Sequence, residues 1–151
     1  MVFFMLAIGS DHGGYELKCE IIKYFDQKGI SYIDFGTNCL DSCDYPVYAK
    51  KVAKAVVSGE CEKGILICGT GIGISIAANK INGVRAAVCS DYFSAKYTRL
   101  HNNANILCLG GRVVGPGLAI ELVDVFLNTE YERGERHGRR LELIREIEEE
   151  K

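Results

Sequence analysis

The chain has 151 residues, of which 48% are hydrophobic and 25% charged, the size and balance of one ordinary globular domain. Its formal net charge of -2 provides no overall positive field, so nothing global predicts a nucleic-acid partner. The longest apolar runs are far shorter than a membrane span, and the apolar start lacks the basic region of a signal peptide. We therefore expect a cytoplasmic protein with neither a membrane nor a nucleic-acid partner.

Short apolar runs alternate with amphipathic stretches along the chain. Residues 3–9 form an apolar run that ends in glycine, which predicts a strand covered on both faces. The stretch 15–29 predicts a helix closed by Gly29. The same criteria predict further strands at 31–36, 63–69, 84–90 and 105–111, and further helices at 45–60, 72–81, 91–103, 115–129 and 140–151.

Strands that alternate with helices predict an α/β fold, with a five-stranded parallel sheet and helices on both of its faces. No linker, repeat or low-complexity segment divides the chain, so we expect a single domain over 1–151. Residues from about 134 onward form a charged helical tail with one apolar stripe. The sequence leaves open whether that stripe packs on its own domain or on a second subunit.

Polar and glycine-rich segments follow the predicted strands. Ligands of open parallel sheets bind beyond the carboxyl ends of the strands. Asp11 and His12 follow the first strand, Cys68 ends the third, and Arg112 follows the fifth. The glycines of "CGTGIGIS", at 69, 71 and 73, allow backbone amides to approach a ligand at the start of the next helix. This edge of the sheet is the predicted site.

The glycine loop alone does not specify its ligand. Its G-x-G-x-G pattern differs from the dinucleotide fingerprint, although Asp91 follows at about the expected distance, so a nucleotide-binding module remains an alternative. A P-loop is excluded because no Gly-Lys-Ser/Thr follows. A tight strand-to-helix turn without any ligand is the third interpretation.

Cys68 has three interpretations: packing, redox chemistry and catalysis. No resolving cysteine is evident beside it, whereas its place before a helix N-terminus suits a thiolate that acts as a general base. The C-x-x-x-C spacing of Cys39 and Cys43 matches neither a zinc knuckle nor a redox pair, and we assign these two no role. The remaining cysteines are expected to be buried or half-buried packing residues: Cys19, Cys61, Cys89 and Cys108.

Histidines and arginines add to the predicted site. We expect His12 and His101 at the same edge as the thiol or just after its helix, which favours chemistry over a structural role. No metal-ligand spacing joins them to Cys68, so we predict no metal. Arg136 and Arg140 are four residues apart and share a helical face, which suits a phosphate, although a solvated patch has the same pattern.

Six motifs in order resemble one family. They are "GSDHGGYELK", "DFGT", "DYPVYA", "GILICGTGIGISIAANK", "AAVCSDYFSAKYTRLHNNANILCLGGRVVG" and "GERHGRR", with the glycine loop within the fourth, and they run from about Ile8 to Arg140. Together they resemble the family of ribose-5-phosphate isomerase B and galactose-6-phosphate isomerase subunits. The resemblance implies a Rossmann-like three-layer α/β/α sandwich. It also implies a homodimer or tetramer with sites shared between subunits, and aldose–ketose isomerisation of a sugar phosphate with no metal or other cofactor.

The resemblance also implies roles for individual residues. Cys68 matches the general base that moves a proton between the first two sugar carbons, and His101 matches the residue that opens the ring. Asp11 and Thr70 match residues that contact sugar oxygens and assist proton transfer. Tyr45 and Asn102 match sugar contacts. The phosphate-binding set is matched by His12, Arg112, Arg136, His137 and Arg140, some of them reaching across from the partner subunit.

The chemistry of isomerisation agrees with these roles. Removal of a proton next to a carbonyl needs one base and donors for the resulting oxyanion. The amides from Gly69 to Gly73 are the predicted donors, directly after the base. Some relatives use a glutamate from the following helix, but here that helix, "IGISIAANK", has no acid. A six-carbon sugar phosphate such as galactose 6-phosphate, or a free aldose such as allose, remains the alternative substrate.

Overall fold

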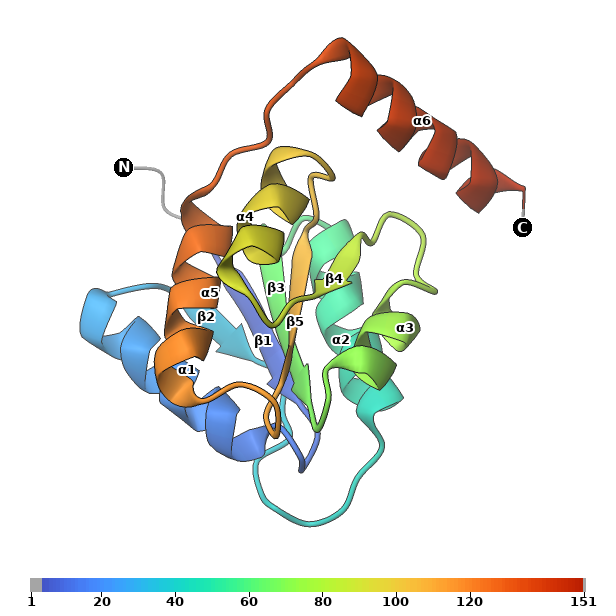
Figure 1. Ribbon diagram of the computed structural model, residues 1–151. Helices are drawn as coiled ribbons and strands as arrows, with labels where there is room; N and C mark the ends of the chain where they lie inside the picture. Colours follow the sequence, from blue (N-terminus) through green and yellow to red (C-terminus); the bar gives the residue numbers. More distant parts are fainter. Residues whose placement is uncertain (1–3, 151) are drawn as a thin grey trace.

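A computed structural model describes residues 4–150 and contains one five-stranded sheet and six helices in the described part (Figure 1). The strands are β1 (Leu6–Ser10), β2 (Tyr32–Asp34), β3 (Lys63–Cys68), β4 (Ala86–Val88) and β5 (Ile106–Gly110). The helices are α1 (Tyr15–Lys28), α2 (Tyr45–Val57), α3 (Ile72–Ala78), α4 (Tyr92–Leu100), α5 (Pro116–Asn128) and α6 (Glu135–Glu149).

The sheet is parallel throughout and has the order β2-β1-β3-β5-β4. β3 lies at its centre, between β1 and β5. Side chains of the central strands alternate between two cores: Ile65 and Ile67 join one, and Leu66 and Cys68 join the other. The first core is closed by α1, α4 and α5, and the second by α2 and α3, which confirms the three-layer α/β/α prediction.

Local chemistry explains where the helices begin and end. Gly29 takes the left-handed conformation that ends α1, with φ of 69°. Asp91 caps α4, since its Oδ1 accepts the Ser94 N–H at 2.7 Å. Most predicted elements are one to three residues shorter in the structure. The first strand begins at Leu6 rather than at residue 3, which lies outside the described residues.

The C-terminal helix differs most from its prediction. It begins at Glu135 rather than at residue 140, after the N-cap Gly134. No residue of α6 is buried, and the apolar stripe of Leu143, Ile144 and Ile147 stays about half-exposed. The C-terminal end of α6 contacts the loop between α3 and β4, because Glu148 Oε1 accepts the Gly83 N–H at 2.9 Å. Figure 1 shows α6 standing away from the three layers, at the end of the molecule opposite the strand arrowheads.

Candidate active site

Cys68 is the last residue of the central strand and is only 4% exposed. Its position is fixed from both sides: β1 and β5 flank β3, and the Gly111 N–H donates to the Cys68 carbonyl at 2.8 Å. The Gly71 N–H donates to Sγ at 3.1 Å. The sulfur thus sits at the carboxyl edge of the sheet, with an amide donor directed at it.

The glycine loop turns tightly around this sulfur. Gly71 has φ of 82°, and a Cβ there would lie 2.8 Å from the Leu109 carbonyl carbon, so only glycine fits. Its amide is already bonded to Sγ, and the Ile72 amide donates to the Thr70 hydroxyl at 3.1 Å. Of the amides predicted as oxyanion donors, those of Gly69, Thr70 and Gly73 therefore remain candidates. Their role as donors stays a prediction.

Arg112 lies across the glycine loop. Its N–H donates to the Gly69 carbonyl at 3.0 Å, and a Cβ on Gly69 would come within 3.4 Å of the Arg112 guanidinium. The loop after β5 therefore brings a positive charge to the loop after β3. This agrees with the predicted anion site at the carboxyl edge.

Asp11 joins the same edge from the neighbouring strand. Its side chain is 6% exposed, and Oδ1 accepts the Gly14 N–H at 3.1 Å. The turn that follows β1, residues 11–14, packs directly on β3, since a Cβ on Gly14 would lie 2.5 Å from the Ile67 carbonyl oxygen. The absence of side chains in this turn allows the close approach that places a buried carboxyl group beside the end of β3.

A pocket of about 670 Å³ opens beside Asp11 and is lined by His12, Cys43, Tyr45 and their neighbours. His12 Nδ1 accepts the Cys43 N–H at 3.2 Å, and the Tyr45 ring lies over Gly73, whose Cβ would meet its hydroxyl oxygen at 2.9 Å. The contact between His12 and Cys43 spans 31 positions along the chain and was not predicted. No local pattern in the sequence indicates it, because Cys43 lies in an irregular loop.

Three of the other cysteines are buried, as Cys68 is. Burial raises the pKa of Cys89 to about 11 and holds that of Cys108 well above its usual range, so both remain thiols near neutral pH. Cys61 is also buried, as predicted. Cys19 is exposed, so the prediction that it packs is wrong: it lies on the outer face of α1.

His101 and Asn102 lie at the opposite edge of the sheet from Cys68. α4 starts at the carboxyl edge after β4, and its nine residues carry the chain back across the sheet by about 14 Å before His101 caps the helix. The prediction that His101 shares an edge with the thiol is therefore wrong within one chain. The reason is geometric, because a crossover helix in a parallel sheet must return to the edge where the next strand begins.

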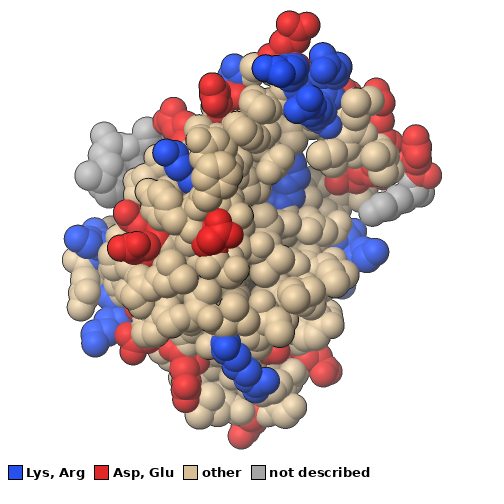
Figure 2. Space-filling view, in the orientation of Figure 1, with Lys and Arg blue, Asp and Glu red and all other residues tan. Residues whose placement is uncertain are grey.

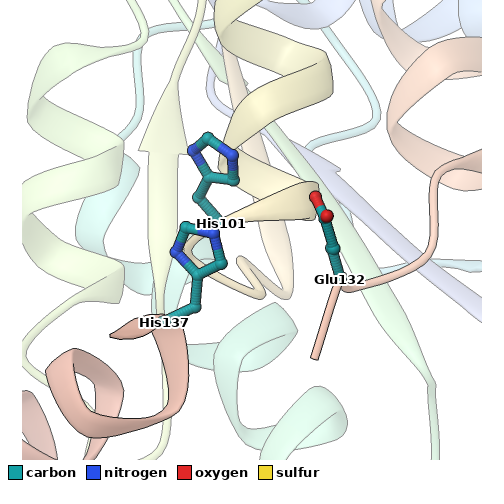
Figure 3. Close-up of side chains that lie close together, drawn as sticks. All are labelled: His101, Glu132 and His137. Atoms are coloured by element: carbon teal, nitrogen blue, oxygen red, sulfur yellow. The ribbon is translucent and has the colours of Figure 1, made fainter. Parts of the chain in front are cut away.

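His137 lies against His101 at that distal edge, and the two rings stack with centroids 4.2 Å apart (Figure 3). Arg136 and Arg140 both lie on α6, because this helix begins five residues earlier than the predicted 140–151. Basic side chains gather where α6 begins (Figure 2). The predicted phosphate-binding set is thus split, with His12 and Arg112 at the carboxyl edge and the other three members on α6.

Asp91 is the N-cap residue of α4. Its carboxylate is engaged by the Ser94 N–H, and that bond lowers the pKa of the carboxyl group from its usual value. The residue that supported a nucleotide-binding module therefore serves as a helix cap.

A family model described as Ribose/Galactose Isomerase matches residues 6–144 of the chain, from the first strand into α6. The chain belongs to this family. It is 52% identical to ribose-5-phosphate isomerase B of Escherichia coli, across 95% of each chain.

Solved structures of the family superimpose closely on this chain. Ribose-5-phosphate isomerase B of Clostridium thermocellum is 55% identical, with a TM-score of 0.95 over 97% of this chain and 98% of its own. A ribose 5-phosphate isomerase of Thermotoga maritima is 50% identical, with a TM-score of 0.92 over 95% of this chain and 98% of its own. The match of fold and sequence over nearly the full length makes the chain an aldose–ketose isomerase of the ribose/galactose isomerase family.

Two groups of residues at the edges of this isomerase could bind charged species. The carboxyl edge offers a cationic arginine beside glycine amides. The distal edge offers His101, Glu132 and His137, whose ligand atoms lie within 4.8 Å of one another. Among residues 4–150, these three are the best placed to hold a metal ion. No helix in that range has the length and apolar content to cross a bilayer, and the cytoplasmic location stays a prediction.

Proposed function

We propose that this isomerase interconverts ribose 5-phosphate and ribulose 5-phosphate through an enediolate, with Cys68 as the general base. The observation that carries the proposal is the Cys68 sulfur, held at the end of the central strand with an amide donor and beside the buried Asp11. Identity of 52% to 55% with ribose-5-phosphate isomerase B proteins, over almost the whole chain, favours the five-carbon substrate over the six-carbon alternative.

Proton transfer requires the base beside the reacting carbons. In the proposed reaction the Cys68 thiolate removes the proton from the second carbon of the open-chain aldose. The electrons of that bond form a carbon–carbon double bond, and those of the carbonyl move onto its oxygen. The enediolate then takes the proton back at the first carbon, while a proton moves between the two oxygens. Asp11 and Thr70 are the groups proposed to carry that second proton.

Charge that develops on the enediolate oxygens requires donors that are already in place. The amides of the glycine loop are proposed to fill this role, and one such donor lowers the barrier of acyl-transfer reactions by about 3 kcal/mol. His12 and Arg112 are proposed to bind the phosphate, which positions the reacting carbons from a distance. Tyr45 closes the pocket over Gly73 and is proposed to contact the sugar.

The proposal includes a second copy of the chain, because one chain separates its site residues onto opposite edges. His101 of the partner subunit would open the sugar ring, and Asn102 would contact the sugar. Arg136, His137 and Arg140 of the partner subunit would complete the phosphate site. Exposed apolar side chains at the carboxyl edge support such a contact: Ile72, Ile76, Val88, Tyr92 and Phe93 are all between 43% and 66% exposed. The half-exposed stripe of α6 is part of the proposed contact.

Isomerisation of ribose 5-phosphate in heavy water tests the chemistry. The wild-type protein should form ribulose 5-phosphate, with solvent deuterium entering at the exchanged carbon, because the thiol proton equilibrates with solvent. Cys68→Ala should lose most of the activity, and Cys68→Ser should do little better because a hydroxyl, unlike a thiol, does not ionise near neutral pH. Full activity of Cys68→Ala would rule out the proposed base.

Mixed dimers test the shared site. Cys68→Ala and His101→Asn should each be inactive alone. When the two variants are mixed and exchange subunits, half of the dimers are mixed and each has one intact site, so about a quarter of the wild-type activity should return. No recovery, with subunit exchange verified by mass spectrometry, would show that each chain carries its whole site.

A further inference from the structure

Three side chains with metal-binding atoms meet at the distal edge of the sheet. His101 ends α4, Glu132 lies in the linker between α5 and α6, and His137 lies in the first turn of α6. Each offers one ligand atom, and these atoms all lie within 4.8 Å of one another. Figure 3 shows the carboxylate and the two imidazoles converging from these three segments.

The backbone holds two of these residues together. The Glu132 N–H donates to the Leu100 carbonyl at 3.0 Å, which fastens the linker to the last turn of α4, directly before His101. The His101 N–H in turn donates to the Tyr97 carbonyl at 2.8 Å. The approach of the Glu132 carboxylate to His101 therefore follows from main-chain bonds and does not depend on the side chains alone.

Aromatic contacts orient the His101 ring. Its face stacks on His137, at an interplanar angle of 18°, and the Tyr97 ring meets it edge-on, with centroids 5.0 Å apart. Tyr97 is held in turn by stacking on Phe93 at 4.1 Å. The stack on His137 occupies a face of the His101 ring, and the ring nitrogens, which lie on its edge, can still offer a ligand atom.

The donor set selects a class of ion. Two imidazoles and one carboxylate suit zinc, nickel and cobalt ions, whereas magnesium and calcium prefer oxygen ligands alone. Ligand atoms around a tetrahedral ion with bonds of about 2.0–2.1 Å are separated by about 3.3 Å. Binding of an ion would therefore require the three side chains to rotate toward one another, and His137 to tilt out of its stack on His101. His101 and His137 are only partly buried and Glu132 is exposed, so these rotations meet little resistance.

We propose that His101, Glu132 and His137 form a site for a divalent transition-metal ion, and that its occupation inhibits the isomerase. The metal would take the lone pair that His101 needs for proton transfer in ring opening, and it would draw His137 away from the phosphate. Glu132 has no part in the proposed reaction, so it separates metal binding from catalysis. The inhibitory part rests on the proposed function, whereas the binding part does not.

The charges around the cluster set the expected strength of the site. The segment 130–140 holds the acidic residues Glu130, Glu132 and Glu135 together with Arg133, Arg136, Arg139 and Arg140. The arginines outnumber the acidic residues by one, and their positive charge disfavours the binding of a metal cation nearby. An exchangeable inhibitory ion is therefore expected, rather than a closed structural site of high affinity.

Titration calorimetry with Ni²⁺ tests the binding. Ni²⁺ is the probe because imidazole suits it and because Cys19, Cys39 and Cys43, which are exposed or partly buried, would compete for zinc. The wild-type protein should bind one ion per chain, and Glu132→Gln should weaken binding by about 10–100-fold or more. Glu130→Gln, two residues away, is the matched control and should bind as the wild type does. Absence of binding, or equal binding by Glu132→Gln, overturns the proposal.

Cobalt absorption identifies the ligands. One equivalent of Co²⁺ should give the visible bands of a cobalt ion bound by nitrogen and oxygen, and these bands should be lost in His137→Asn. A sulfur-to-cobalt charge-transfer band at the first equivalent would mean that a cysteine binds the ion, and would overturn the assignment.

Kinetics test the inhibition separately. Ni²⁺ should inhibit isomerisation by the wild-type protein and by Glu130→Gln, and EDTA should restore it. Glu132→Gln should keep the basal rate and lose most of the inhibition. Binding without inhibition would remove the inhibitory role alone, whereas absence of turnover in metal-free wild-type protein would count against the proposed function and not against the site.

Discussion

The two edges of the sheet are built in different ways. At the carboxyl edge, three loops approach so closely that a Cβ on Gly14 or Gly71 would lie within 3 Å of a neighbouring backbone atom, and Cys68 is nearly fully buried. At the distal edge, His101 and His137 are only partly buried, on segments that the linker between α5 and α6 brings together. The proposed base, Cys68, is thus enclosed by closely packed backbone, whereas at the distal edge main-chain bonds place the segments and ring contacts orient the imidazoles.

The largest expected effect comes from the thiols of the central strands. Cys68→Ala should lower the rate of isomerisation by about 10²–10⁴-fold, because it removes the proposed base. Cys108→Ala is the matched control, since Cys108 is fully buried in the adjacent strand and its raised pKa keeps it a neutral thiol. That variant should lose about 1 kcal/mol of stability and keep its activity. Steady-state kinetics and urea unfolding separate the two effects, and equal activity losses would contradict the assignment.

A buried lysine should contribute strongly to the stability of the carboxyl edge. Lys18 is 1% exposed, and its Nζ donates to Asp34 Oδ1 and to the Thr37 carbonyl, both at 2.6 Å. The Thr37 N–H donates to the carbonyl of Ser10, the residue before Asp11, at 2.7 Å. Lys18→Met should therefore destabilise the protein by about 3 kcal/mol, at the lower end for a broken buried pair because Asp34 is partly exposed.

Urea unfolding of Lys18→Met measures this effect, with Lys54→Met as the control. Lys54 is exposed on α2, so its replacement should change stability by no more than about 0.5 kcal/mol. Isomerase activity measured well below the unfolding midpoint should also fall in Lys18→Met, because Asp11 loses a support. Stability equal to that of the control would show that the carboxyl edge does not depend on the buried lysine.

Replacement of glycine by alanine should change the stability of the protein in opposite directions at the two edges. Gly14→Ala places a methyl group 2.5 Å from the Ile67 carbonyl oxygen and should destabilise the protein by about 1–3 kcal/mol. Gly138→Ala lies within α6, has no atom within 4 Å of the new methyl group, and should stabilise the helix by about 0.5–1 kcal/mol. Thermal unfolding reports the first, and slower amide exchange in α6 reports the second. Two changes of the same sign would mean that both edges are equally packed.

The smallest expected effect is the pH dependence of the α4 cap. The Ser94 N–H lowers the pKa of Asp91 in the folded protein, so the cap stabilises the fold above the ordinary carboxyl pKa of about 3.9. This stabilisation is lost as the pH falls through the lower pKa of the folded state. Asp91→Asn should cap α4 equally well without this titration. Below about pH 4, the melting temperature of the wild-type protein should therefore fall more steeply with pH than that of Asp91→Asn. If the two curves of melting temperature against pH run parallel, titration of the α4 cap does not contribute to acid unfolding.

Much of the fold could be predicted because short stretches of the sequence indicate their own secondary structure. The alternation of apolar runs and amphipathic stretches gave the order of strands and helices, Gly29 and Asp91 gave two helix ends, and glycines around Cys68 gave the carboxyl edge. The start of α6 was placed five residues late, because its first turn is polar and carries a glycine. The contact of Cys43 with His12 was missed, since a long loop leaves no periodic pattern.

The sequence by itself determined the family, the parallel sheet and the set of residues that are proposed to carry the chemistry. Hydrophobic periodicity and glycine positions are local properties of a chain, and they suffice for the parallel sheet and its carboxyl edge. The family and the residue roles came from the resemblance of six sequence motifs. Only the tertiary structure decided which of those residues meet. A crossover helix returns His101 to the edge opposite Cys68, and a main-chain bond from the linker brings Glu132 beside it. Such distances depend on helix length and chain path rather than on spacing along the sequence.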